Sequence, residues 1–277
     1  MDIRNIILRE KNVSMTDVLS IISFVCDTTR ERVLADMNKE IEGDSLAQIE
    51  KLLGERKTGK PLAYITERKE FYSQDFFVND SVLVPRPETE TLVEKALNIM
   101  ARRKDIADIL DMGTGSGAIG LTIARKTKKH VVCVDISERA LSVARKNALD
   151  IKTDAPVDLL CSDLFAGIKE GPCFDMILAN LPYVADEEWS GLMVDVKDFE
   201  PKGALCGGKG GMEIYREFLH HTQTYLKNEG YVLCEIGGSR QAHQIKSLLD
   251  TTGFRTTIEN DYSGQERIVI GLWINLS

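Results

Sequence analysis

The chain has 277 residues, of which 43% are hydrophobic, and a formal net charge of −8. This hydrophobic content allows one large domain or two modest ones and excludes a disordered chain. No apolar run approaches the roughly 18 residues of a membrane span, and the N-terminus lacks a signal-peptide pattern. The six cysteines are scattered without a CxxC pair, which favours a cytoplasmic protein with reduced thiols over one with disulfides or a metal site. The acidic balance argues against direct nucleic-acid binding.

Residues 1–66 are predicted to form a helical domain, because apolar residues recur there at helical spacing. Thr16 and Asp44 are the expected N-caps of two of its helices. Residues 67–87 are rich in aromatic and β-branched residues and are predicted to be a β-hairpin linker, which ends in a proline-rich stretch. A helix is expected to begin near Glu88, with acidic residues in its first turn.

Residues 88–277 are predicted to form an α/β domain in which strands alternate with helices, as in a parallel sheet covered on both faces. The predicted strands are 106–113, 130–135, 157–163, 174–180, 230–237, 254–260 and 267–273. Only a short turn separates the last two strands, so they should pair as an antiparallel hairpin. A seven-stranded, mostly parallel sheet whose last strand is antiparallel resembles the class I S-adenosylmethionine methyltransferase fold. The plain dinucleotide-binding fold lacks this ending.

A glycine-rich loop joins the first of these strands to the next helix. It comprises Gly113, Thr114, Gly115, Ser116 and Gly117. Glycines allow a tight turn and a close approach of the backbone to a ligand, so this loop is a candidate cofactor site. The other ligand-binding functions are expected at the ends of the second and third strands: Asp135 could accept hydrogen bonds from two ribose hydroxyls, Asp163 from an adenine amino group, and Leu164 could cover the adenine. These features fit both S-adenosylmethionine and a dinucleotide.

The fourth strand opens into Asn180, Leu181, Pro182 and Tyr183, which resembles the (Asn/Asp/Ser)-Pro-Pro-(Tyr/Phe) motif of enzymes that methylate planar nitrogens. An amide nitrogen is a poor nucleophile because its lone pair is delocalised. The Asn180 side-chain oxygen and the Leu181 carbonyl could accept its two N–H bonds and stabilise the charge that develops during direct in-line methyl transfer. Tyr183 offers a flat face for stacking, and Pro182 restricts the backbone that aims the Leu181 carbonyl.

Longer segments make the resemblance more specific. They are 59–71 (GKPLAYITERKEF), 82–94 (VLVPRPETETLVE), 109–120 (ILDMGTGSGAIG), 174–184 (FDMILANLPYV), 200–218 (EPKGALCGGKGGMEIYREF) and the terminal GYVLCEIG and DYSGQERIVIG. In these segments the chain resembles the release factor glutamine-N5 methyltransferase (PrmC/HemK) family.

The resemblance implies a substrate, a cofactor and site residues. The substrate would be the glutamine of the GGQ loop of peptide-chain release factors. The cofactor would be S-adenosyl-L-methionine, leaving S-adenosyl-L-homocysteine, and the enzyme would be a cytoplasmic monomer. The glycine loop, Asp135 and Asn180 would contact the cofactor, and residues 180–183 would hold the glutamine amide. Arg86 and Glu88 would border the mouth of the site, and residues 1–66 would recognise the substrate.

Three departures from the family pattern bear on this interpretation. Leu181 replaces a usual proline, which restores a backbone N–H but keeps the carbonyl. Glu67 stands where glycine often follows Tyr-Ile-Thr, and Leu164 stands where an aromatic is common. The Asn-Leu-Pro-Tyr form also occurs in ribosomal-RNA adenine N6-methyltransferases, so methylation of adenine in RNA or DNA is the main alternative. A nicotinamide-dependent oxidoreductase would leave this segment unexplained. A non-catalytic binding module with the same fold is the third alternative.

Overall fold

The computed structural model describes residues 1–274, which divide into two compact units. The first unit comprises Met1–Arg68 together with Met193–Phe199, and the second comprises Lys69–Leu192 and the chain from Glu200 onward. The inclusion of the 193–199 segment in the first unit was not foreseen from the sequence. No helix between residues 1 and 274 is long and apolar enough to span a membrane.

The first unit is helical and has its own apolar core. Its helices are α1 (Ile3–Arg9), α2 (Met15–Val25), α3 (Arg30–Ala35), α4 (Gly43–Lys57), α5 (Leu62–Ile65) and, from the later segment, α9 (Val194–Lys197). Ile6, Ile22, Ile49 and Leu53 are among its fully buried side chains. The helical spacing of apolar residues therefore identified a genuine core.

Both predicted N-caps in this unit are wrong. Helix α2 begins two residues earlier than Thr16 would allow, because the Ser14 hydroxyl accepts a hydrogen bond from the Asp17 N–H at 3.0 Å. Helix α4 begins at Gly43, directly before the predicted cap Asp44, and the residue that precedes it makes no side-chain capping bond. Ser14 with an acidic residue three positions later is a capping signal that the sequence contains.

A two-stranded hairpin opens the second unit. Strands β1 (Arg68–Phe71) and β2 (Gln74–Phe77) are joined by Tyr72 and Ser73, whose φ angles of +50° and +58° suit a tight two-residue hairpin turn. Asn147 of helix α8 (Glu138–Ile151) holds this hairpin in place: its side chain accepts from the Phe77 N–H at 2.7 Å and donates to the Phe77 carbonyl at 3.0 Å.

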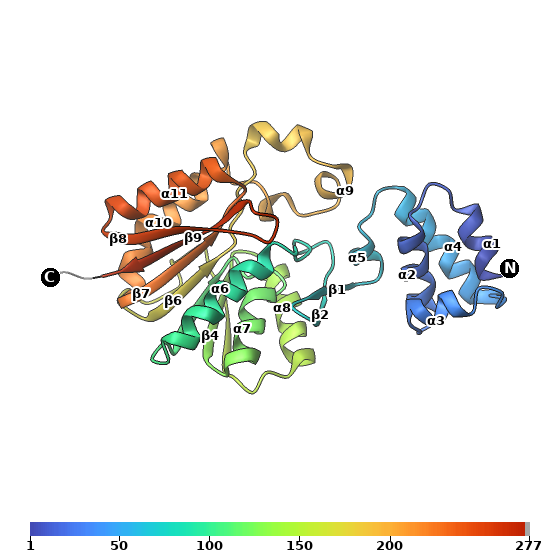
Figure 1. Ribbon diagram of the computed structural model, residues 1–277, viewed down its shortest axis with the longest axis horizontal. Coiled ribbons are helices and arrows are strands. Elements are labelled where there is room, and N and C mark those ends of the chain that lie inside the picture. The colour runs from blue at the N-terminus through green and yellow to red at the C-terminus, as the bar shows by residue number, and fades with distance from the viewer. Residues whose placement is uncertain (275–277) are drawn as a thin grey trace. The chain divides into compact units, whose positions relative to one another are not determined.

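The rest of the second unit is a seven-stranded sheet with helices on both faces (Figure 1). The strands are β3 (Asp108–Met112), β4 (His130–Asp135), β5 (Val157–Cys161), β6 (Phe174–Ala179), β7 (Leu226–Glu235), β8 (Phe254–Asn260) and β9 (Glu266–Trp273). The helices are α6 (Thr89–Arg102), α7 (Ala118–Thr127), α8 (Glu138–Ile151), α10 (Glu213–Tyr225) and α11 (Ser239–Thr251), with short 3-10 turns at Asp186–Gly191, Lys202–Ala204 and Lys209–Gly211.

The order of strands across the sheet is β5-β4-β3-β6-β7-β9-β8. All neighbours are parallel except β9, which is antiparallel to both β7 and β8. This confirms the predicted class I methyltransferase fold, including the terminal hairpin. The direction of strand addition reverses between β3 and β6, and open α/β sheets bind ligands at such a point, beyond the carboxyl ends of the strands.

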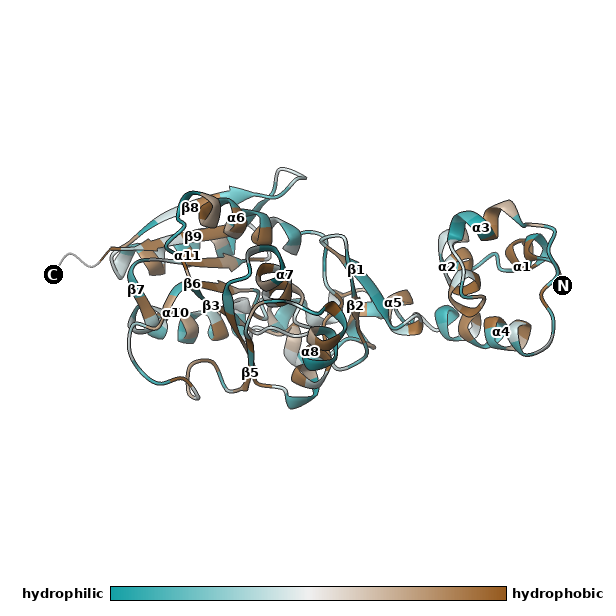
Figure 2. Ribbon diagram, turned by 90° about the horizontal axis from the view of Figure 1, so that it is seen from below, coloured by the Kyte–Doolittle hydropathy of each residue, from teal (hydrophilic) through white to brown (hydrophobic). Residues whose placement is uncertain are grey.

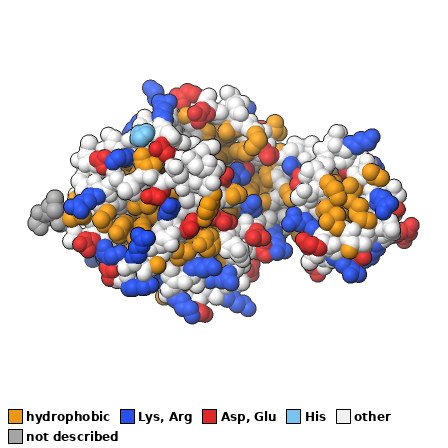
Figure 3. Space-filling view, in the orientation of Figure 1, with side chains coloured by type: hydrophobic (Ala, Val, Ile, Leu, Met, Phe, Trp, Pro, Cys, Tyr) orange, Lys and Arg blue, Asp and Glu red, His pale blue; other side chains and the backbone are white. Residues whose placement is uncertain are grey.

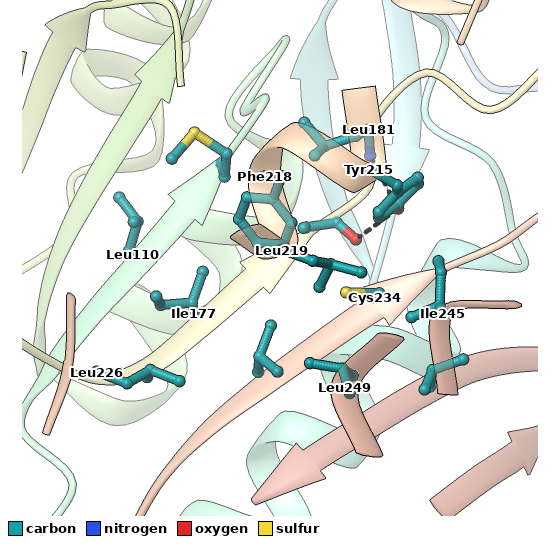
Figure 4. Close-up of a cluster of buried hydrophobic side chains, with 14 of the residues drawn as sticks. Leu110, Ile177, Leu181, Tyr215, Phe218, Leu219, Leu226, Cys234, Ile245 and Leu249 are labelled. Carbon is teal, nitrogen blue, oxygen red and sulfur yellow. Dashed lines mark hydrogen bonds between the residues drawn. The ribbon is translucent and has the colours of Figure 1, made fainter. Parts of the chain in front are cut away.

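Two apolar layers sandwich the sheet. Helices α6 and α7 cover one face, with side chains such as Leu92 and Ile119, and α10 and α11 cover the other. The central strands are largely hydrophobic in Figure 2, as expected for strands buried on both faces. Figure 4 shows part of the second layer, where Tyr215 and Phe218 of α10 pack near Leu181 and Cys234. This layer therefore reaches the segment that follows β6.

The face shown in Figure 3 mixes Lys and Arg with Asp and Glu, and groups of hydrophobic side chains lie between them. The charges of both signs are interspersed on this face.

Candidate active site

The glycine loop begins where β3 ends and is held against β4. The N–H groups of Gly113 and Thr114 both donate to the Val134 carbonyl, at 2.8 and 2.9 Å. Gly113, Gly115 and Gly117 have φ angles of +74°, +54° and +82°, a region in which side chains other than glycine are strained. Gly117 also caps α7, so the loop leads directly into a helix N-terminus, where backbone N–H groups favour negative charge.

The buried Asp111 carboxylate holds the glycine loop and the start of α7 in place through two hydrogen bonds. Asp111 Oδ2 accepts from the Thr114 hydroxyl at 2.5 Å and from the Gly120 N–H at 2.9 Å. Burial raises the pKa of Asp111 to about 6, although both hydrogen bonds favour its charged form. A side chain at position 120 would place its Cβ 2.5 Å from Cys133 Sγ, so the close packing of α7 on β4 requires glycine here.

Asp135 is the last residue of β4, and its carboxylate accepts hydrogen bonds from the glycine loop and from the start of the next helical segment. Its Oδ2 accepts from the Gly115 N–H and its Oδ1 from the Ser137 N–H, each at 2.9 Å. Burial raises its pKa. Ser137, and not Asp135, caps α8, since the serine hydroxyl accepts from the Ala140 N–H at 3.2 Å. Asp135 is therefore not needed as the N-cap of α8.

Asn180 and Leu181 follow β6 and lie against the glycine loop. A Cβ built on Gly113 would be 2.9 Å from Leu181 Cδ2 and 3.7 Å from the Asn180 carbonyl oxygen. The Asn180 side chain donates from Nδ2 to Thr89 Oγ1 at 3.1 Å. The Leu181 N–H, which the usual proline would lack, donates to the Tyr215 hydroxyl at 3.2 Å. The leucine therefore adds an anchor to this segment.

Two glycines of the 200–218 segment lie directly against the backbone of Pro182 and Tyr183. A Cβ on Gly207 would lie 2.4 Å from the Pro182 carbonyl oxygen, and one on Gly211 would lie 2.1 Å from the Tyr183 carbonyl oxygen. The Tyr183 carbonyl also accepts from Gln241 Nε2 at 2.7 Å. These close backbone contacts leave the segment little freedom to shift.

Arg86 is held by a residue more than a hundred positions away. Its Nη2 lies 2.6 Å from Glu200 Oε1, and Glu200 Oε2 accepts from the Val84 N–H at 3.2 Å. Two of the segments that resemble the family, 82–94 and 200–218, thus meet at this ion pair.

These elements surround one cavity of about 510 Å³. The predicted site residues that line it are Arg86, Gly113, Thr114, Gly115, Ser116, Asp135, Asp163, Leu164, Asn180, Leu181 and Pro182. Three predicted residues are not among its lining. Gly117 turns the chain into α7, Glu88 is exposed as the residue before α6, and the Tyr183 ring packs 3.0 Å from where a Cβ on Gly237 would be. Their assigned functions remain predictions.

The charge of the lining favours a cationic ligand. Four carboxylates line the cavity, those of Asp135, Asp163, Glu213 and Glu217. Arg86 is the only Lys or Arg among the lining residues, and it is paired with Glu200. Such a surface attracts positive charge and opposes a pyrophosphate. No cluster of three or more potential metal ligands occurs among residues 1–274.

Thr89 and Glu235 were not predicted as site residues from the sequence. Thr89, the first residue of α6, lines the cavity, and Glu235, the last residue of β7, is 1% exposed. Burial raises the pKa of Glu235 from 4.5 to about 7, and the nearby Thr89, Arg267 and Asn180 side chains partly oppose this rise. An acidic residue at the end of a buried strand was a signal that could have identified Glu235.

The raised pKa of Glu235 predicts a pH-dependent stability. The folded state holds this proton more tightly than the unfolded chain, so the contribution is full below about pH 4.5 and is lost as the pH rises to about 7. The free energy of unfolding of the wild type should fall relative to that of Glu235→Gln by about 3 kcal/mol from pH 4.5 to 8. Urea titrations of both proteins at several pH values measure this difference. A difference that stays constant with pH would contradict the prediction.

The strand order of the sheet, together with a cavity at the point where strand addition reverses, defines the chain as a methyltransferase. Residues 89–196 match the Methyltransferase small domain, and residues 7–66 match the PrmC N-terminal domain. The chain is 38% identical over 256 residues to the release factor glutamine methyltransferase of Koribacter versatilis, covering 92% of this chain and 89% of that one. It is 36% identical over 272 residues to the release factor glutamine methyltransferase of Clostridium acetobutylicum, covering 96% of this chain and 94% of that one. The chain therefore belongs to the release factor glutamine methyltransferase family.

Solved structures share the fold at low sequence identity. A methyltransferase from Pyrococcus furiosus is 17% identical with a TM-score of 0.55, covering 75% of this chain and 92% of that one. The hMettl16 catalytic domain, solved in complex with MAT2A 3'UTR hairpin 6, is 14% identical with a TM-score of 0.58, covering 73% and 76%. At these identities the likeness concerns the fold alone.

Proposed function

We propose that this protein uses S-adenosyl-L-methionine to methylate the side-chain nitrogen of the glutamine in the GGQ loop of peptide-chain release factors. The observation that carries the proposal is the contact between Leu181 and the glycine loop, which brings a planar-nitrogen motif and a cofactor loop into one cavity. Membership of the family supplies the identity of the substrate.

The lining residues fit S-adenosyl-L-methionine better than a dinucleotide. The cofactor carries a sulfonium and an ammonium group, which suit a cavity with four carboxylates and one paired arginine. Its single carboxylate suits the N-terminus of α7. Gly113–Gly117, with Asp135, Asp163 and Leu164, would bind it. This fit argues against the oxidoreductase alternative.

When bound, the cofactor supplies a methyl group on a positively charged sulfur: the amide nitrogen forms a bond to that carbon as the carbon–sulfur bond breaks, S-adenosyl-L-homocysteine remains, and one N–H proton passes to water. The protein orients the amide and stabilises its growing positive charge. Asn180 Oδ1 would accept one N–H and the Leu181 carbonyl the other, both already in place before the reaction. The anchor from the Leu181 N–H to Tyr215 steadies this acceptor. Tyr183, Arg86 and Glu88 would contact the substrate chain around the glutamine.

The organisation of the chain gives each part a function in this proposal. Residues 1–66 recognise the release factor, residues 67–87 link the parts, and residues 88–277 bind the cofactor and perform the transfer. The match of residues 7–66 to the PrmC N-terminal domain supports a dedicated function for the helical unit.

The experiment that tests the proposal combines the enzyme, methyl-labelled cofactor and a bacterial release factor, followed by peptide mapping by mass spectrometry. One methyl group is expected on the GGQ glutamine, and none on a release factor whose GGQ glutamine is replaced by alanine. A parallel reaction with ribosomal RNA tests the adenine alternative. Label in RNA, or in neither substrate, would refute the proposal.

Asp135→Ala should chiefly weaken cofactor binding, because the variant loses a charged acceptor for the ribose hydroxyls and the hydrogen bond that shapes the loop at Gly115. Hydrogen bonds to charged groups contribute about 1.5–3 kcal/mol, so the Kd should rise about 10- to 100-fold. Isothermal titration calorimetry measures this change. Asp154→Ala, which removes an exposed carboxylate outside the cavity, is the control. An unchanged Kd for Asp135→Ala would exclude Asp135 from ribose binding.

A further inference from the structure

We propose that Ser162 is a positioning residue for the cofactor, because its hydroxyl holds Leu164 in a left-handed backbone conformation at the wall of the cavity. The inference rests on the proposed function, in which Leu164 covers the adenine of S-adenosyl-L-methionine. Ser162, Asp163 and Leu164 directly follow β5, and all three line the cavity. Asp163 and Leu164 were predicted to contact the adenine, whereas Ser162 was not predicted as a site residue.

Leu164 has an unusual backbone conformation for a branched, apolar residue. Its φ angle is +44°, a region in which the Cβ of an L-residue crowds the carbonyl group. The Ala166 N–H donates to the Asp163 carbonyl at 3.0 Å, so Leu164 is the second residue of a tight turn, where glycine, asparagine or aspartate normally provides a positive φ. Among residues 1–274, Leu164 is the only non-glycine residue with a positive φ that lines the cavity. Strain of this kind persists only where neighbouring contacts enforce it, and it is common at ligand sites.

The Ser162 hydroxyl provides such a contact. It donates to the Leu164 carbonyl at 3.1 Å and accepts from the Gly167 N–H at 2.7 Å, while the Asp163 carbonyl is farther away at 3.5 Å. Ser162 is 8% exposed, which limits the replacement of these bonds by water. The Ser162 N–H donates to the Asp135 carbonyl at 3.0 Å. The serine is therefore itself fixed to the end of β4, at the residue whose carboxylate is proposed to bind the ribose.

Two further contacts leave the turn little freedom. A Cβ at Gly167 would lie 3.0 Å from Ser162 Oγ, so a larger residue at this position would have to displace the serine. Phe165 is buried, and its ring stacks on that of Tyr225 with the centroids 4.4 Å apart. The chain is thus anchored before and after Leu164, and the hydroxyl bond acts on the Leu164 backbone itself.

The placement of Leu164 matters for binding because this side chain lies between the core and the cavity. It is half-buried, packs on the apolar layer that contains α10 and lines the cavity. A leucine offers the adenine less area than the aromatic residue common in the family, so the contact depends more on correct placement. A wall that is in place before the cofactor arrives loses little conformational freedom on binding, which favours affinity. Ser162 should therefore act on cofactor affinity, whereas methyl transfer depends on Asn180 and Leu181 in another segment.

Ser162→Ala should raise the Kd for S-adenosyl-L-methionine about 5- to 20-fold, because without the hydroxyl the left-handed conformation of Leu164 becomes a minor one. In turnover the loss should appear in the KM for the cofactor and not in kcat. 5′-Methylthioadenosine, which keeps the adenine and the ribose but lacks the amino-acid part, should lose affinity by the same factor. Isothermal titration calorimetry measures both dissociation constants. Ser142→Ala is the control, because Ser142 is exposed, donates to the Glu138 carbonyl at 2.9 Å and lies outside the cavity.

The decisive measurement is Ser162→Ala in the Leu164→Gly background. Glycine adopts a positive φ without strain, so Leu164→Gly removes both the side chain over the adenine and the need for the hydroxyl. Leu164→Gly should itself weaken binding, and the addition of Ser162→Ala should then change the Kd less than twofold. An equal loss in both backgrounds would overturn the inference, because the hydroxyl would then act on something other than Leu164. An unchanged Kd for Ser162→Ala alone, or a loss of affinity that spares 5′-methylthioadenosine, would also overturn it.

The cycle remains available if Ser162→Ala does not fold. Ser162→Cys, whose thiol forms only weak hydrogen bonds, then takes its place with the same criteria. These titrations need no release factor, whereas methylation of a release factor by the wild type tests the proposed function. Failure of the cycle alone therefore refutes only the function assigned to Ser162.

Discussion

Asn180→Ala is expected to slow methyl transfer about 100- to 1,000-fold while the affinity for S-adenosyl-L-methionine stays within a few-fold. The variant loses a preorganised oxygen at the point where positive charge develops on the amide nitrogen. The glycine loop and Asp135 are untouched, since their hydrogen bonds do not involve the Asn180 side chain. The loss therefore concerns the transition state much more than cofactor binding.

Single-turnover kinetics with a release factor, together with calorimetric titration of the cofactor, separate the chemical step from binding. Asn260→Ala is a suitable control, because Asn260 is exposed at the end of β8 and does not line the cavity. Normal single-turnover rates in Asn180→Ala would show that this side chain is not at the reacting centre. A large loss of cofactor affinity with an unchanged rate would assign Asn180 to binding instead.

The layout of the second unit could be predicted from sequence because each of its signals is local. Apolar runs such as 174–180 mark strands buried on both faces, glycines mark the tight turn after β3, and the short turn at 261–264 marks the final hairpin. Parallel strands bring their carboxyl ends to one edge, so residues at those ends can be assigned to a common site from the sequence alone. The structure places eleven of the predicted residues around one cavity for this reason.

The supporting contacts could not be predicted, because they join segments that are distant in the sequence. Arg86 and Glu200 are 114 positions apart, and Asn180 and Thr89 are 91 apart. Glu235 gave a weak signal as the last residue of an apolar strand, and its environment depends on α6 and β6 packing around it. The N-cap error at Thr16 has a different origin: Ser14 and Thr16 are both good capping residues, and the acidic Asp17 three positions after Ser14 is the local signal that favours Ser14.

Gly207→Ala is expected to lower turnover about 100-fold through a displacement of the Asn-Leu-Pro-Tyr segment, since a misplacement of about 1 Å at a reacting group can cost that much. The added methyl would lie 2.4 Å from the Pro182 carbonyl oxygen and 2.9 Å from the Gly211 carbonyl oxygen. Both are backbone atoms, which cannot rotate away as a side chain would. The displacement should pass along the backbone to the Leu181 carbonyl, which is the second acceptor for the amide. Single-turnover rates and thermal unfolding should be measured on the same preparation.

Gly191→Ala is the matched control, because its added methyl meets no atom within 4 Å and the φ angle at Gly191 is not positive. It should keep wild-type turnover and lose little stability. Gly207→Ala should also bind S-adenosyl-L-methionine nearly as well as the wild type, since the glycine loop and Asp135 belong to other segments. A Gly207→Ala protein that is folded and fully active would mean that Pro182 can move without moving the acceptors. In that case the rigidity of the 180–183 segment would not contribute to catalysis. Asn180 would then stabilise the transition state without a rigid backbone to hold it in place.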